Sequence, residues 1–296
     1  MRLLAATDFS ESAGLALDRA VSLASLHPDA SLTLMHVQAA EGFEVVRQMF
    51  SAEVEKIEQA LAADAAGRLQ SLAVTCEEVL ERKVDKLLSR GRAESEIVAA
   101  AQESVDLILM GERGKASSPF LGGTIERVLQ RTNCSVLAVK QPVAGPYRRL
   151  LVGVSSGGGP PTAAELAFLL NPGSDIILLH AFEAPFEDRF RRAGAAESWV
   201  TDYQVQSERA AEQEMERWGS RLEAAGIQAR RLVVRGSPAA SILEYGRSLA
   251  ADLIVVGKRK RSVLGGLLFG DVARQVTVES TADVLVAASL PDLRTP

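Results

Sequence analysis

DLILMGERG, residues 106–114, recurs as DLIVVGKRK at residues 252–260, a shift of about 146 positions. Each copy is an apolar run that begins after an aspartate and ends at a glycine, and charged residues follow it. Four more pairs of similar segments follow the same order at nearly the same shift. Self-similarity of this kind indicates one domain duplicated in tandem.

The other four pairs extend the repeat over most of the chain. They are LLAATDFS (3–10) with LLVGVSSG (150–157), LTLMHV (32–37) with IILLHA (176–181), SRGRAESEIVAAA (89–101) with VRGSPAASILEYG (234–246), and SVLAVK (135–140) with DVLVAA (283–288). Between the copies lies QPVAGPYRR, residues 141–149, whose two prolines and glycine are typical of a linker. We therefore expect one domain over residues 1–142 and a second over 148–296.

Each copy alternates short apolar runs with longer helical patterns. Strands that are apolar along their whole length are typical of a parallel sheet covered by helices on both faces, so we expect the α/β class with a doubly wound sheet. In the first copy we expect strands near 2–7, 31–37, 84–89, 106–110 and 135–139, and helices near 11–26, 42–72, 93–103 and 122–132. Residues 73–88, AVTCEEVLERKVDKLL, fit a helix, a strand or both.

Five strands joined by right-handed crossovers, with helices on both faces, predict the strand order 3-2-1-4-5. The winding then reverses between strands 1 and 4, and ligands of such sheets bind in the crevice beyond the carboxyl ends of these two strands. Asp8 comes directly after strand 1, and Gly111 follows strand 4. The sequence therefore predicts a binding crevice between Asp8 and Gly111.

Composition excludes several classes of function. The 296 residues carry a net charge of -5 and a pI of about 5.5, so no overall positive charge favours nucleic acid or anionic membrane as a partner. The apolar run before Asp8 is too short for a secretory signal, and we expect the protein in the cytoplasm. Two cysteines and three histidines exclude a disulfide framework and a cysteine zinc site, and no other metal site is expected.

Both copies resemble the universal stress protein domain, an adenine-nucleotide-binding relative of the Rossmann fold. The resemblance implies two Rossmann-like domains of the adenine nucleotide alpha hydrolase-like type. ATP-binding members have an aspartate after strand 1 and a loop of pattern G-x2-G-x9-G-(S/T) after strand 4. Carried over by position, and with two basic residues that could add charge, the resemblance nominates Asp8, Val37, Gly111, Arg113, Gly114, Lys115, Gly122, Gly123 and Thr124. Glycines let the backbone approach phosphate oxygens, and a helix that begins near Gly122 would direct N–H groups at the anion.

The loop departs from the family pattern in two ways. Only seven residues separate Gly114 from Gly122, and Gly123 stands where the family has a hydroxyl, with Thr124 next to it. Fewer phosphate contacts follow, so ATP, ADP, AMP and a vacant site stay open as alternatives. A magnesium ion could accompany the phosphates.

The second copy departs further from the pattern. Lys260 replaces the second glycine, Asp271 replaces the hydroxyl, and Ser155 stands in the place of Asp8. A carboxylate at the start of the last helix would repel a phosphate there, so we expect no ATP in this copy. The basic run 258–261 fits a solvated loop or a site for a phosphate or an acidic partner.

No set of side chains suggests catalysis, and we expect a protein that is not an enzyme. The resemblance implies a regulatory protein of the stress response that binds adenine nucleotide in its first domain and is read by a protein partner. A slow ATPase and a nucleotide-free scaffold are the alternatives. The resemblance also implies that strands 135–139 and 283–287 pair within the chain, and a homodimer is possible.

Two further interpretations concern single residues. We expect His36 and His180, at equivalent positions late in strand 2, to have packing or hydrogen-bonding roles. Glu94, Glu96 and Arg127 fall on predicted helices and fit surface charges or helix caps.

Overall fold

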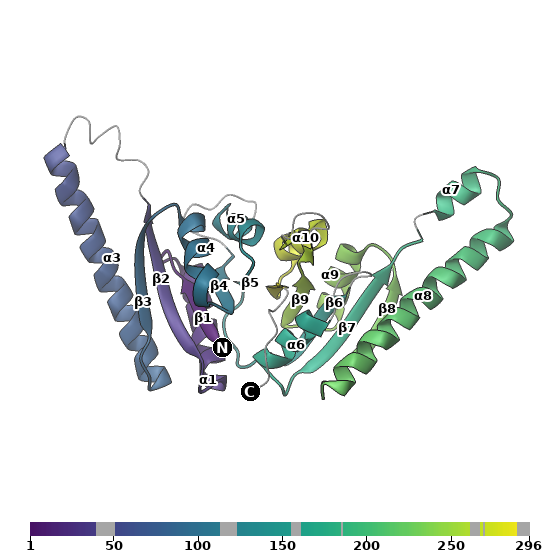
Figure 1. Cartoon of the computed structure of the whole chain (residues 1–296), viewed down its shortest axis with the longest axis horizontal. Helices are drawn as coiled ribbons and strands as arrows, with labels where there is room; N and C mark the ends of the chain where they lie inside the picture. Colours follow the sequence, from purple (N-terminus) through teal and green to yellow (C-terminus); the bar gives the residue numbers. More distant parts are fainter. Residues whose placement is uncertain are drawn as a thin grey trace. The chain divides into compact units, whose positions relative to one another are not determined.

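A computed structural model describes residues 1–39, 51–112, 123–154, 161–184, 186–260, 267–268 and 270–288 (Figure 1). The chain forms two compact units, unit 1 over Met1–Pro146 and unit 2 over Tyr147–Pro296. Each unit is described by itself.

Unit 1 contains a five-stranded parallel sheet in the order β3-β2-β1-β4-β5. Its elements are β1 (Arg2–Ala6), α1 (Glu11–Leu26), β2 (Ser31–Ala39), α3 (Ser51–Leu80), β3 (Asp85–Gly91), α4 (Ala93–Ser104), β4 (Leu107–Gly111), α5 (Gly123–Arg131) and β5 (Ser135–Val139). Helix α1 packs with α3, and α4 packs with α5, so helices cover the sheet in two separate pairs. The predicted fold class and strand order are confirmed.

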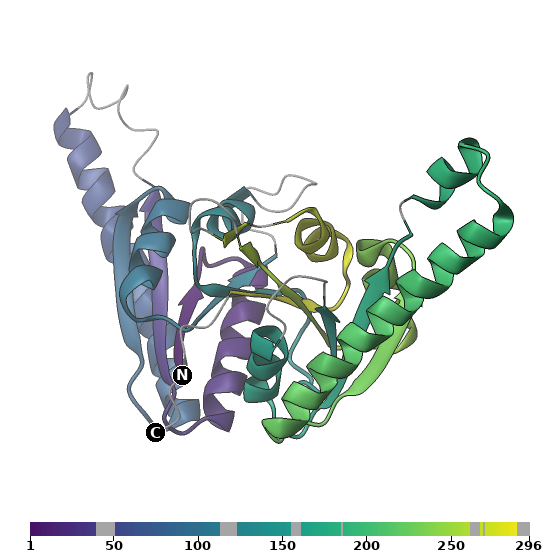
Figure 2. The ribbon, with the colours of Figure 1, turned by 45° about the vertical axis from the view of Figure 1, so that its right-hand side comes forward.

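Unit 2 repeats this order as β8-β7-β6-β9-β12, again with parallel pairing. Its elements are β6 (Arg149–Val154), α6 (Pro161–Leu170), β7 (Asp175–Phe182), α7 (Glu187–Arg192), α8 (Glu197–Ala224), β8 (Arg230–Arg235), α9 (Pro238–Ser248), β9 (Leu253–Gly257), β10 (Arg259–Lys260), β11 (Leu267–Leu268), α10 (Asp271–Glu279) and β12 (Asp283–Ala287). Helix α8 lies along β7 and β8 and extends past their carboxyl ends, where α7 packs against it (Figure 1 and Figure 2). Strands β10 and β11 form a small antiparallel ribbon of their own.

The main difference from the predicted elements is the helix expected near 42–72. Its end is wrong, because α3 continues to Leu80; residues 40–50 lie outside the described ranges. Of the alternatives for residues 73–88, the structure has both, since the helix ends at Leu80 and β3 begins at Asp85. The buried positions Ala65, Leu69, Ala73 and Cys76 keep helical spacing along one face, so packing on the sheet carries the helix beyond residue 72. Glu81, with a φ of 52°, follows the end of the helix.

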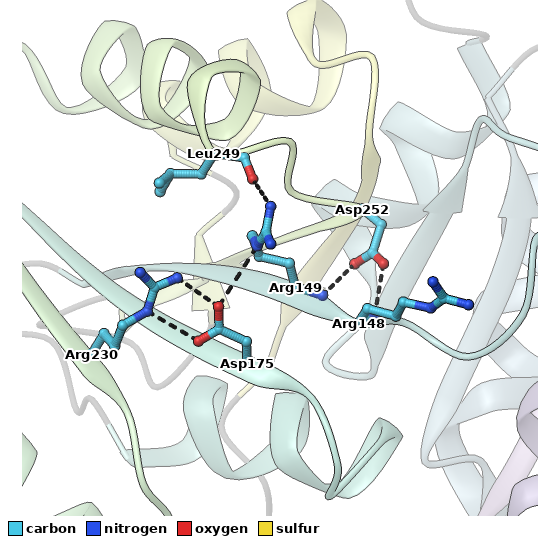
Figure 3. A network of polar contacts seen from close by, with 6 residues as sticks. All are labelled: Arg148, Arg149, Asp175, Arg230, Leu249 and Asp252. Atoms are coloured by element: carbon cyan, nitrogen blue, oxygen red, sulfur yellow. Dashed lines mark hydrogen bonds and ion pairs between the residues drawn. The ribbon is translucent and has the colours of Figure 1, made fainter.

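The amino edge of each sheet is closed by an aspartate that precedes its fourth strand. In unit 2, Asp252 accepts hydrogen bonds from the backbone N–H groups of Arg148 (2.7 Å) and Arg149 (3.1 Å) (Figure 3). The Arg149 guanidinium also donates to the Leu249 carbonyl and lies 3.6 Å from Asp175. These contacts fasten the start of β6 to the start of β9.

Unit 1 has the same connection. The Arg2 backbone N–H donates to Asp106 at 2.7 Å, and the Arg2 guanidinium pairs with the same carboxylate at 2.8 Å. Burial would raise the pKa of Asp106, but the hydrogen bonds and charge of Arg2 outweigh it and lower that pKa. Both sheets therefore use one carboxylate to join strand 1 to strand 4.

Candidate functional site

The residues predicted to border a crevice lie at the carboxyl edge of unit 1, where β1 and β4 are neighbours in the sheet. Ala5 pairs with Leu109, so the residues that follow the two strands emerge at the same edge. A Cβ at Gly111 would lie 2.4 Å from the Ser12 carbonyl oxygen, in the first turn of α1. Real Cβ atoms do not approach backbone that closely, so glycine is required at this position. The end of β4 therefore packs directly against the first turn of α1, which follows Asp8.

The turn after β1 is held by its own side chains. Thr7 Oγ1 accepts from the Phe9 N–H at 3.0 Å, and Asp8 Oδ1 accepts from the Ser10 N–H at 3.0 Å. Ser10 then caps α1, because its Oγ accepts from the Ala13 N–H at 3.2 Å. Phe9 has a φ of 61°, which is rare outside glycine and is common at functional sites. These bonds fix the half-buried Asp8 carboxylate at the carboxyl edge of the sheet.

The Phe9 side chain contacts two others, His36 and Arg68. The centroid of the His36 ring lies 4.3 Å from that of Phe9. The guanidinium of Arg68, a residue of α3, lies 4.1 Å from the Phe9 centroid. His36 Nδ1 also lies 2.8 Å from the Thr7 carbonyl oxygen. These contacts connect the turn after β1, which contains Asp8 and Phe9, to β2 and α3.

His180 repeats the role of His36 in unit 2. Its Nδ1 lies 3.1 Å from the Val154 carbonyl oxygen, and its ring packs edge-on against Trp218 at 5.3 Å. The predicted packing and hydrogen-bonding roles of the two histidines are confirmed. Within the described ranges, no group of three or more His, Cys, Asp or Glu side chains is arranged to hold a metal ion.

Val37 lies at the end of β2 that has no pairing with β1. Strand β1 pairs with β2 as far as Met35, whereas β2 continues to Ala39 with β3 as its partner, and Val37 pairs there with Ser89. This end of β2 therefore extends past the end of β1 at the same edge of the sheet as Asp8.

A pocket of about 570 Å³ lies beside this end of β2, between β2, β3 and the first half of α3. Its lining residues are Gln38, Glu55, Glu58, Gln59, Ala62, Leu88, Ser89 and Arg90. Arg90 pairs with Glu58 across it at 2.6 Å. This pocket could not be predicted from the sequence, because none of its lining residues belongs to a motif and the Arg90–Glu58 pair joins residues that are distant in sequence.

A charged cluster connects α4 to α5. Glu94, in the first turn of α4, is only 4% exposed, and its carboxylate lies 3.0 Å from Arg92 and 3.7 Å from Arg127. Burial would raise the pKa of Glu94, but the backbone N–H of Glu94 and the two guanidinium groups outweigh it and lower that pKa. Of the two expectations for Glu94, a surface charge is therefore wrong, because the side chain is buried, whereas a helix cap fits, because the carboxylate accepts from its own backbone N–H in the first turn of α4.

The rest of the predicted loop is described only in part. Gly123 begins α5, and Thr124 is half-buried in its first turn. Arg113, Gly114, Lys115 and Gly122 lie outside the described residues. The structure thus brings Asp8, Val37 and Gly111 to one edge of the sheet and makes Gly123 the first residue of a helix.

The corresponding edge of unit 2 has a different composition. Asp271 is the first residue of α10, directly after the cap residue Gly270, while Ser155 lies outside the described residues. Lys258 is buried, so the interpretation of the basic run as a solvated loop is wrong at that position. Its backbone N–H donates to the Ala287 carbonyl at 2.9 Å, which keeps this residue against β12.

None of the helices in the part of the chain that the structure describes combines the length and apolar character needed to span a membrane.

Comparisons with known proteins agree with this architecture. The sequence profile of the universal stress protein family matches residues 1–140 and 146–288. A universal stress protein of Mycolicibacterium smegmatis is 27% identical over 301 residues, which cover 96% of each chain. A second, from Mycobacterium bovis, is 25% identical over 206 residues; the match covers 67% of this chain and 64% of the relative's length.

A solved structure extends the likeness to the fold. The crystal structure of a universal stress protein from Archaeoglobus fulgidus superposes with a TM-score of 0.64, at 20% sequence identity and with 98% of each chain covered. These comparisons agree: the family profile matches twice in tandem, one relative aligns over nearly the whole length, and the fold is shared. The chain belongs to the universal stress protein family and carries two of its domains in tandem.

Proposed function

We propose that the protein is a regulatory protein of the stress response that binds one adenine nucleotide, ATP in the first instance, at the carboxyl edge of unit 1. The observation that carries this proposal is the close approach of Gly111 to Ser12, which puts the end of β4 against the helix turn that follows Asp8. In doubly wound sheets, this position between strands 1 and 4 is where ligands bind.

The residues at this edge fit an adenine nucleotide. Asp8 supplies a fixed carboxylate that can accept hydrogen bonds from a base or a ribose. Val37, at the free end of β2, offers backbone groups for the adenine. Gly123 and Thr124 begin α5, whose first N–H groups and positive dipole end favour a phosphate. A magnesium ion would enter with the phosphates.

Unit 2 is proposed to leave this ligand unbound. Asp271 opens α10 with a carboxylate where unit 1 has Gly123, and a carboxylate near a phosphate is repulsive. Ser155 cannot provide the charge that Asp8 provides. The two units then differ in function although they share a fold.

The proposal includes no turnover of the nucleotide. Hydrolysis needs a group that positions the attacking water against the γ-phosphate. The imidazole of His36 is already engaged by the Thr7 carbonyl, which argues against its use as a base. The bound nucleotide would instead shift the protein towards the conformation that binds it better, and a partner would read that shift. The cytoplasmic location, the partner, a homodimer and the pairing of residues 135–139 with 283–287 stay predictions.

Calorimetric titration of the full chain with ATP tests the proposal. We expect saturable binding, and no release of inorganic phosphate above that of a heat-denatured control. A flat titration would reject nucleotide binding and favour a nucleotide-free scaffold. Steady phosphate release that Gly114→Val abolishes would favour the ATPase instead.

A further inference from the structure

The guanidinium of Arg127 lies beside the first residue of α5. A Cβ at Gly123 would be 3.4 Å from the Arg127 Nη2 atom and 3.6 Å from its Cζ atom, which is ordinary contact distance. The side chain therefore turns back along the helix towards its start, as side chains four residues into a helix can do. The Arg127 guanidinium therefore lies within contact distance of position 123 and places cationic donors beside the start of α5.

Arg127 is held in this place by the buried Glu94. The distance of 3.7 Å between Arg127 and the Glu94 carboxylate is an ion-pair distance, longer than a good hydrogen bond. The tighter partner of Glu94 is Arg92, which donates from Nε at 3.1 Å and lies within 3.0 Å through Nη2. Arg127 is 55% exposed, so its guanidinium is accessible from solvent at the start of α5.

We propose that Arg127 binds a phosphate group of the nucleotide, a role that rests on the proposed function. A guanidinium presents a planar fork of donors that matches two phosphate oxygens. Beside it, the first N–H groups of α5 point towards the same anion. The site then distinguishes phosphorylated nucleotides from the bare nucleoside, since adenosine has nothing for Arg127 to contact.

Unit 2 lacks each part of this arrangement. In the aligned segments, Gln275 stands in the place of Arg127, and Ala239 stands in the place of Glu94. Asp271 adds a carboxylate where Gly123 leaves room. The positive charge at the start of the last helix thus occurs in unit 1 together with the carboxylate that holds it, and both are replaced in unit 2.

The test compares ATP with adenosine by calorimetric titration of the full chain. The variant is Arg127→Gln, which installs the residue that unit 2 has at this position. The control is Arg131→Gln, which removes one positive charge from the same helix one turn later, where Arg131 contacts Ser95 at 3.2 Å. We expect Arg127→Gln to weaken ATP binding about tenfold, the loss of one charge-assisted hydrogen-bonded contact, and to leave adenosine binding unchanged. Arg131→Gln should bind both ligands as the wild-type protein does.

The other outcomes separate this inference from the proposed function. Wild-type protein that binds neither ligand would overturn both. Unchanged ATP affinity in Arg127→Gln, with the wild-type protein binding ATP, would overturn the phosphate role alone. Equal weakening of ATP and adenosine binding, or a large fall in Tm, would show that Arg127 has a structural role in unit 1. Either result would also overturn its role as a phosphate ligand.

Discussion

Asp106 in unit 1 and Asp252 in unit 2 accept hydrogen bonds from the backbone at the start of the first strand, and each joins that strand to the fourth. The histidines late in the second strands repeat their contact with a carbonyl in the same way. Contacts that build the sheet have thus been kept in both copies of the domain.

The carboxyl edges of the units differ at one position after another. Glu112 of unit 1 pairs with the buried Lys140 at 2.9 Å, whereas Lys258 stands in the place of Glu112 in unit 2. The backbone bond at this position is nevertheless retained, since the Glu112 and Lys258 N–H groups donate to Val139 and Ala287. The comparison teaches that the fold constrains the backbone of this edge, while the side chains at the same positions are free to differ between the units.

The largest expected effect concerns Gly111 and its counterpart in the sequence, Gly257. Gly111→Ala forces a Cβ into the Ser12 backbone, and we expect it to lower the free energy of unfolding by about 3 kcal/mol. Gly257→Ala is the matched control, because a Cβ there meets no atom of the described residues within 4 Å. Chemical denaturation followed by circular dichroism measures both. Equal effects would contradict the special packing of the Asp8 turn in unit 1.

Glu94 gives the next effect, since Ala239 replaces it in unit 2. Glu94→Gln should lower the free energy of unfolding by about 2 kcal/mol at pH 7, the cost of losing a buried, charge-paired acceptor. The pKa of Glu94 is lowered from 4.5 in the folded protein, so its carboxylate stabilises the fold above pH 4.5. That stabilisation is lost as the pH falls through the lowered pKa.

The measurement is unfolding at a series of pH values from 7 down to 3. We expect the difference between wild-type protein and Glu94→Gln to shrink over the acid end of the series. The exposed Glu244→Gln on α9 is the control and should have little effect. A difference that stays constant with pH would show that the charge of Glu94 does not stabilise unit 1.

Asp8 tests the ligand side of the comparison. Asp8→Asn keeps an acceptor for the Ser10 N–H and removes the charge, and we expect ATP binding to weaken about tenfold, or about 1.4 kcal/mol, with little change in Tm. Ser155→Ala, at the equivalent position of unit 2, should leave ATP binding unchanged. Calorimetric titration distinguishes the two variants. Loss of affinity in Ser155→Ala alone would transfer the site to unit 2.

The smallest expected effect is the same in both units. Asp106→Asn and Asp252→Asn each weaken the bonds that fasten strand 1 at the amino edge, and each should cost about 1 kcal/mol of unfolding free energy. Neither should alter ATP binding, because each lies at the amino edge of its own sheet, whereas Asp8 lies at the carboxyl edge of the sheet of unit 1. Thermal unfolding with and without ATP checks this. A loss of nucleotide affinity in either variant would contradict the division of roles between the two edges.

The sequence was sufficient to predict the sheet. The segment pairs, together with the handedness of crossovers, lead to one strand order, and that order places Asp8 and Gly111 at the same edge. The predicted end of the helix that became α3 was wrong, because residues 73–88 combine helix formers with valines. Their local preference is balanced, and the buried face that includes Ala73 and Cys76 decides it.

The site was less accessible to prediction from the sequence. Glu94 looks like an ordinary helix carboxylate, and its burial depends on how α5 packs against α4. Arg127 is three residues beyond Thr124, where the family's motif region ends, and its nearness to Gly123 follows from the direction of side chains on a helix.

The central claim is that one of two duplicated domains binds nucleotide. Native mass spectrometry of the full chain with added ATP counts the nucleotides on each chain directly. We expect one ATP per chain, lost in Asp8→Ala and retained in Ser155→Ala. Two nucleotides per chain, or a single nucleotide that survives Asp8→Ala, would contradict the account.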